Sequence, residues 1–413
     1  MSKAPTGHDD VERSTAWHIG FTTVLTLAMA IATFPQFALG ALGPVLVDDL
    51  ELSRAGLGSL STAFFIVATP ASSFVGHLGE RLGGRRLLAL LFAVATASLV
   101  SMAIAPSYPW LLVAVGLGGL AIAASNPSTN ALIAGHLPSG RRGAVVGLKQ
   151  SGVQVGSFIA GAVLPGLALA IGWRNAVLLV AVLSGAGLVG AITVVPRDPA
   201  TTRRSREAGG PSTVVRWLVP YAFFMGAGVS ATTAYLALYA NETLGMSEAT
   251  AGALLAVVGA VGVVARILWG RAAERRPTIA GPLAVLTIAA LASVALVWLA
   301  TYAGAWLVWP AAVGVGATAA AWNSVGMLAI VRETAGRGTS RASGHVLTGF
   351  YAGLLVMPIA FGALVDTTGT YSPAWGLTLV TLAVALGLAL AWRRAGRTPD
   401  ARAPSDPTTR GAP

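Results

Sequence analysis

Gly76–Arg86 reads GHLGERLGGRR, and this short stretch decides the fold that the sequence predicts. It lies between two long apolar runs and places four glycines, one acid and three arginines in eleven residues. A basic turn of this length joins two helices on one face of a membrane. A fainter copy, GRAAERR, stands at Gly270–Arg276, again between two apolar runs. Two copies of one turn predict a chain built from two similar halves.

The composition is that of a membrane protein. The chain is 55% hydrophobic and only 10% charged. Apolar runs of about 20 residues span a bilayer core, and such runs must be helices because lipid satisfies no backbone polar group. We therefore predict an all-α membrane protein. Its twelve transmembrane helices should lie near 17–40, 55–77, 87–106, 110–135, 144–170, 174–195, 216–240, 249–270, 278–302, 306–331, 342–365 and 373–394.

The predicted helices divide into two pseudo-symmetric bundles of six. Residues 1–196 form the N-terminal half, 197–213 a polar, basic linker, and 214–413 the C-terminal half with a disordered tail. Corresponding positions are Trp17 and Trp217, Glu80 and Glu274, Asn126 and Asn323, Gly152 and Gly349, and Gly156 and Gly353. Parallel repeats of this kind are a transporter architecture with substrate held between the halves.

The positive charge of the chain is concentrated on one side of the predicted membrane. The net charge is +11, but the outer loops hold only Arg54 and Arg174. Arginine accumulates in cytoplasmic loops, so we expect both termini and the linker to be cytoplasmic in a multi-pass protein of the cell membrane. The charge then belongs to the inner face and indicates no nucleic-acid partner. The expected partners are the bilayer and a small-molecule substrate, and we expect a monomer.

The turn at Gly76–Arg86 resembles the cytoplasmic signature of the major facilitator superfamily, Gly-x-Leu-x-Asp-Arg-x-Gly followed by basic residues. Gly76, Leu78, Arg81, Gly83, Arg85 and Arg86 match it, Glu80 replaces the aspartate, and Gly84 takes a usually basic place. The resemblance implies secondary transport by alternating access. It also implies that the turns and their neighbours gate the cytoplasmic side through a charge network. The expected gating residues are Glu80, Arg81, Arg85, Arg266, Glu274 and Arg275.

The stretch 124–174 carries most of the polar residues expected inside the membrane. Asn126 and Asn130 flank Pro127, while Gln150 and Gln154 form a stripe one helical turn apart. Lys149 is the only lysine within the expected spans. Such groups face the bundle or a water-filled cavity. We interpret Lys149 as a cationic anchor for an anionic substrate; the alternative is a lysine that snorkels to the headgroups.

Further candidate substrate contacts come from the first, seventh and tenth helices. They are Phe34, Gln36, Tyr235, Trp322 and Asn323. Aromatic rings and amides can shape a pocket with few polar contacts, and a generic aromatic lining is the alternative.

The stretch ending at Gly172-Trp173-Arg174 resembles the cyanate-permease-like branch of the superfamily and related organic-anion carriers. The same helix partly resembles an antiporter signature, from which it departs at Ser157 and Ala160. No Walker loop, metal-ligand cluster or nucleophile–base set occurs, so we expect neither an enzyme nor a cofactor. No acid lies at the expected midplane, which disfavours a cationic substrate. We therefore expect transport of a small organic anion, with efflux of hydrophobic drug-like compounds as the alternative.

Overall fold

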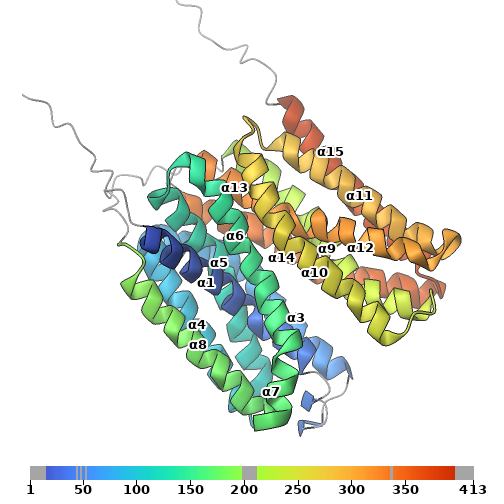
Figure 1. Cartoon of the computed structure of the whole chain (residues 1–413), viewed down its shortest axis with the longest axis horizontal. Coiled ribbons are helices and arrows are strands. Elements are labelled where there is room, and N and C mark those ends of the chain that lie inside the picture. The colour runs from blue at the N-terminus through green and yellow to red at the C-terminus, as the bar shows by residue number, and fades with distance from the viewer. Residues whose placement is uncertain are drawn as a thin grey trace, which may run out of the picture.

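The computed structural model describes residues 15–42, 45–46, 49–51, 54–197, 212–334 and 338–395, and only the backbone at 54–58 and 248–249. The regular structure in these residues is entirely helical. The N-terminal helices are α1 (Thr15–Ala41), α3 (Arg54–Leu82), α4 (Gly84–Ala103), α5 (Tyr108–His136), α6 (Ser139–Ala162), α7 (Leu164–Ile171) and α8 (Trp173–Thr193). The C-terminal helices are α9 (Thr213–Glu242), α10 (Glu248–Glu274), α11 (Ala280–Ala303), η1 (Ala305–Leu307), α12 (Val308–Ala317), η2 (Ala319–Ala321), α13 (Trp322–Thr334), α14 (Thr339–Thr368) and α15 (Ser372–Ala395). Figure 1 shows them as two bundles side by side, blue to green and yellow to red. Most of the predicted linker lies outside the described residues.

Eleven described helices are long and apolar enough to cross a membrane, and the bent pair of α6 and α7 brings the number of spans to twelve. The prediction of twelve spans is confirmed in this sense, but the fifth is not one straight helix. It bends by 40° at Val163. Pro165 follows two residues later, and proline removes a backbone donor and collides with the preceding turn.

The tenth span is broken, where the sequence predicts a continuous helix over 306–331. Thr318 leaves helical geometry at φ −128° and ψ −77° between α12 and η2. Side chains satisfy two of the carbonyls near the break: Thr318 Oγ1 donates to Gly314 O at 2.6 Å, and Trp269 Nε1 donates to Ala317 O at 2.8 Å. Irregular backbone persists inside a membrane only where protein satisfies it in this way.

The stretch that predicted the fold forms the sharp turn between α3 and α4. Gly83 has a φ of 82°, a backbone region that glycine enters without a steric penalty. We call the end of the molecule that carries this turn, Gly270–Arg276 and the starts of α6 and α14 the arginine-rich end, and the opposite end the far end.

The two halves pack tightly against each other at the arginine-rich end. There α3 contacts α14, and α6 contacts α10. A Cβ atom on Gly76 would lie 2.8 Å from Ser340 O, and one on Gly147 would lie 2.6 Å from Arg266 O. Small residues let helix backbones approach this closely in membranes. The interface therefore depends on glycine at these positions.

Candidate functional site

A buried polar cluster joins α5 and α6 inside the N-terminal half. Lys149 is fully buried, and its Nζ donates to Asn126 Oδ1 at 2.8 Å and to Thr129 Oγ1 at 2.7 Å. Gln150 Nε2 donates to the same Asn126 oxygen at 2.8 Å. Lys149 thus points into the bundle and not to the headgroups. No ion pair of Lys149 occurs in the described part of the chain, so its buried amine is held by neutral oxygens.

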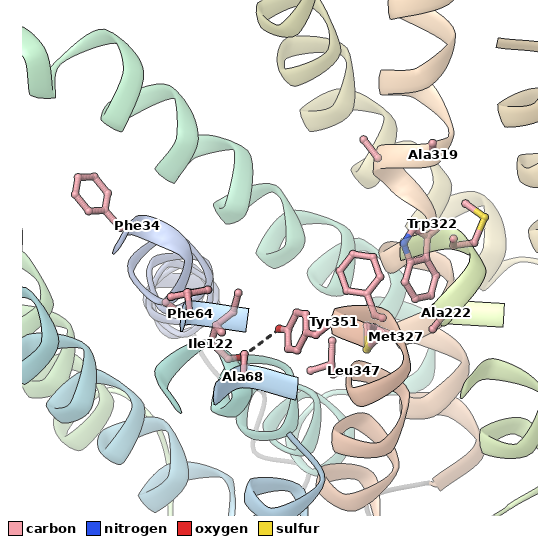
Figure 2. Close-up of a cluster of buried hydrophobic side chains, with 14 of the residues drawn as sticks. Phe34, Phe64, Ala68, Ile122, Ala222, Ala319, Trp322, Met327, Leu347 and Tyr351 are labelled. Atoms are coloured by element: carbon pink, nitrogen blue, oxygen red, sulfur yellow. Dashed lines mark hydrogen bonds between the residues drawn. The ribbon is translucent and has the colours of Figure 1, made fainter. Parts of the chain in front are cut away.

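A second set of polar contacts crosses from this cluster to the other half. Asn130 Nδ2 donates to Ser343 Oγ at 2.9 Å, and Ser340 Oγ donates to Pro127 O at 2.9 Å. Deeper in the bundle, the Tyr351 hydroxyl donates to Ile122 O at 3.3 Å, the dashed line in Figure 2. Tyr351 lies about 18 Å along α14, at 1.5 Å per residue. The seal between the halves therefore reaches from the arginine-rich end to about the middle of the membrane.

Trp322 and Asn323 lie at the start of α13, directly after the break in the tenth span. Trp322 is fully buried, with its ring 5.8 Å from that of Tyr221 and 5.2 Å from that of Phe350. Figure 2 shows Trp322 in the same buried cluster as Tyr351. Trp322 Nε1 and Asn323 Oδ1 are both buried without a hydrogen-bond partner.

The remaining predicted substrate contacts each have partners of their own in this conformation. Gln36 Nε2 donates to Ser61 Oγ at 3.0 Å, and Phe34 is 3% exposed within the N-terminal core. Tyr235 stacks on Phe361 at 4.3 Å and donates to Pro358 O within the C-terminal half. Gln154 faces the other half near Gly262 of α10. A shared substrate pocket for all ten predicted residues stays a prediction.

The two signature acids bind the other half through backbone groups. Glu80 accepts from Gly338 N and Arg341 N, both at 3.2 Å, at the start of α14. Glu274 accepts from Gly143 N at 2.7 Å in the first turn of α6. A carboxylate is stabilised at a helix N-terminus by free N–H groups and by the helix dipole. The pseudo-symmetric acids thus close the arginine-rich end with two equivalent contacts.

The predicted gating arginines take no part in these two contacts. Arg81 and Arg275 are exposed, and Arg85 donates to Ile192 O in its own half. Arg266 is 6% exposed, and its Nε and Nη1 have no hydrogen-bond partner. Among the described residues, the signature acids contact helix ends, and the charge network that the resemblance implies stays a prediction.

Sequence reasoning missed Thr129, Ser340 and Ser343. Thr129 stands one turn after Asn126, so it shares the face of α5 that receives Lys149. The two serines begin α14 at the level of the signature turn. The sequence could have indicated them, because they are small polar residues that lie one helical turn from predicted site residues or beside the predicted turn.

Two helical bundles that enclose buried polar groups are an arrangement found in membrane transporters. The sequence profile of the Major Facilitator Superfamily matches residues 25–340, and the chain belongs to this family. The protein is thus a multi-pass secondary transporter of small solutes and not an enzyme. The fold agrees with that of FucP, a transporter solved in an outward conformation. The TM-score is 0.73 at 16% identity, over 91% of this chain and 99% of the other.

Curated relatives are distant and differ in what their names say they handle. A chloramphenicol resistance protein of Streptomyces lividans is 28% identical over 93% of this chain and 98% of its own length. A gentisate transporter of Corynebacterium glutamicum is 34% identical over 39% of this chain and 37% of its own length. A gallate transporter of Pseudomonas putida is 30% identical over 38% of this chain and 35% of its own length. These relatives leave the substrate open.

Proposed function

We propose that the protein carries a small organic anion between the two faces of the membrane by alternating access of its halves. The observation that carries the proposal is Lys149, a lysine sealed in the bundle and held by the neutral oxygens of Asn126 and Thr129. A buried cation without a counterion is costly, and an anionic substrate lowers that cost. Gallate and gentisate, named for two relatives, are such anions.

Lys149 has no exposed surface in this conformation, so the proposal requires movement. The halves are sealed from the arginine-rich end to mid-depth. Rocking of the halves would uncover the polar cluster, as expected for a site near the midplane between two repeats.

The test compares ligands by charge on purified protein. Gallate and gentisate are expected to raise the melting temperature more than chloramphenicol or a lipophilic cation. Lys149→Gln should weaken anion binding about tenfold, the equivalent of roughly 1.4 kcal/mol. Lys149→Arg should be intermediate, because it keeps the charge and changes the reach. Arg141→Gln, which removes an exposed arginine at the start of the same helix, is the control. Unchanged anion affinity in Lys149→Gln would reject the anchor.

A second candidate function is efflux of a drug-like compound. It is favoured by the relative from Streptomyces lividans, which matches almost the whole chain. In that case Lys149 is a structural residue, and chloramphenicol stabilises the protein where the carboxylates do not.

We also propose that the arginine-rich end faces the cytoplasm, with the division into halves at 197–213. The support is the arginine asymmetry between the two ends. The chain has no cysteine of its own, so single cysteines report cleanly. An impermeant thiol reagent added to intact cells should label Thr370→Cys at the far end and leave Ser205→Cys in the linker unlabelled. The reverse pattern would invert the orientation.

A further inference from the structure

The break in the tenth span leaves a helix N-terminus in the interior of the bundle. Helix α13 begins at Trp322 and ends at Thr334, near the arginine-rich end. At 1.5 Å per residue its first turn lies about 18 Å from its last, which is near the middle of a hydrocarbon core roughly 30 Å thick.

Three side chains in this first turn each have a buried polar atom without a hydrogen-bond partner. These atoms are Trp322 Nε1, Asn323 Oδ1 and Ser324 Oγ. Trp322 and Ser324 have no exposed surface. A single buried polar atom without a partner costs about 1–3 kcal/mol, and native proteins contain few. Consecutive helical residues point about 100° apart, so the three atoms do not face one spot. The donor among them is Trp322 Nε1, which a carboxylate can satisfy.

Arg266 of α10 is a second buried group without hydrogen-bond partners. Its side chain is 6% exposed, and its Nε and Nη1 are buried without partners. Helix α10 packs against both η2 and α13. In the described part of the chain Arg266 forms no ion pair. It is therefore a buried cation whose counterion is missing.

The register of the two helices brings Arg266 to the level of the break. Going along α10, Val258 packs against Gly316, and one turn later a Cβ on Gly262 would lie 3.7 Å from Ala320 Cβ. One further turn brings Arg266 level with Ser324. Helical side chains lean back toward the N-terminus of their own helix, so we expect the Arg266 guanidinium at the depth of Trp322.

We propose that Arg266 and the first turn of α13 bind the carboxylate of the transported molecule. This inference rests on the proposed transport of an organic anion and names the residues that hold the charged group. The guanidinium offers planar donors that suit a carboxylate, and the Trp322 indole N–H, which has no partner, adds a further donor. Lys149, whose amine already has two acceptors, then acts from the opposite half.

The test is equilibrium binding by calorimetry on the full-length protein, with gallate, gentisate and the primary amide of each. Arg266→Gln should weaken carboxylate binding at least about tenfold and change amide binding less than about twofold. Arg266→Lys should recover part of the loss. Trp322→Phe keeps the ring and removes the donor, and should weaken the carboxylate several-fold. Arg271→Gln removes an exposed arginine from the same helix and is expected to bind like the native protein.

The outcomes separate this inference from the proposed function. If native protein binds a carboxylate and Arg266→Gln and Trp322→Phe bind it equally well, the carboxylate site is wrong and anion transport stands. If native protein binds neither gallate nor gentisate, anion transport fails and the site fails with it. A gating role of Arg266 would change carboxylate and amide affinities together, which also rejects the site. If Arg266→Gln does not fold, Trp322→Phe and Ser324→Ala provide the test. Either variant should then weaken binding of the carboxylate more than binding of the amide.

Discussion

Asp49 ties together the far end of the N-terminal half. Its carboxylate accepts from Arg174 Nη1 at 2.7 Å and from Trp173 Nε1 at 3.1 Å. The hydrogen bond from Arg174 is the main cause that lowers the pKa of Asp49, and partial burial opposes it. A depressed pKa means that the pair stabilises the fold above the unfolded pKa, about 3.9, and that this stability is lost as the pH falls through the folded value.

We therefore predict that Asp49→Asn lowers the melting temperature slightly at pH 7 and that the difference disappears toward pH 3. The pair is 40% exposed on both sides, so the effect should stay below about 1 kcal/mol. Thermal unfolding in detergent across this pH range measures it, with the exposed Glu51→Gln as control. A difference that grows as the pH falls would contradict the assigned bond.

Single residues also show where sequence reasoning stops. The spacing of Gln150 and Gln154 predicts one stripe, yet Gln150 bonds Asn126 in its own half and Gln154 faces Gly262 of the other. Residues four apart differ by about 40° around a helix. This difference is enough for Gln150 to contact α5 and for Gln154 to contact α10. The sequence shows which residues are polar inside the membrane, but which neighbour each one meets depends on tertiary packing.

The interface helices α6 and α10 touch backbone to backbone. A Cβ on Gly143 would collide with Gly270 O and would lie 2.7 Å from the Glu274 side chain. We predict that Gly143→Val prevents closure of the arginine-rich end and shifts the protein toward the conformation open at that end. Spin-label distances between Arg86→Cys and Arg393→Cys, both exposed, should lengthen.

Gly140→Ala is the matched control for this prediction. It lies one turn earlier in α6, and a Cβ there has nothing within 4 Å. The control should keep the native distance distribution. If Gly143→Val keeps it as well, the close contact of α6 and α10 does not limit closure.

The positions of the helices follow from the sequence far better than their interruptions. Long apolar runs place the spans, and proline at 165 accounts for the bend at Val163. No proline marks the break at Thr318, which lies in the alanine-rich run ATAAAW. Local propensity favours a helix there, and packing of α10 against α12 and η2 overrides it. The helix that starts after this break carries the unpartnered side-chain atoms of Trp322, Asn323 and Ser324.

At the level of the whole molecule, the two copies of the signature turn form two contacts between the halves. The acid of each half binds the first turn of a helix in the other half: Glu80 at α14 and Glu274 at α6. The sequence predicted both acids as gating residues and placed them in equivalent turns. It could not predict that their partners are backbone N–H groups, because almost every residue has such a group and the sequence does not mark which ones lie near the acids.

The last prediction concerns the balance that these two contacts set. A carboxylate at a helix N-terminus contributes about 0.3–1 kcal/mol when exposed and up to about 2 kcal/mol when partly buried. Glu80 is exposed and Glu274 is half-buried, so Glu274→Gln should shift the population toward the open arginine-rich end more than Glu80→Gln does. Because the two contacts share no partner, their free energies should add in the double variant.

The Arg86→Cys and Arg393→Cys spin-label pair measures this balance, and Glu333→Gln, which removes an exposed acid at the same end, is the control. Ligand affinity should change only by the population factor, a few-fold for either single variant. A large loss of affinity with an unchanged distance distribution would mean that the acids act on substrate and not on the gate. Equal shifts for Glu80→Gln and Glu274→Gln would show that burial does not set the strength of these contacts, even though the two acids occupy equivalent places in the fold.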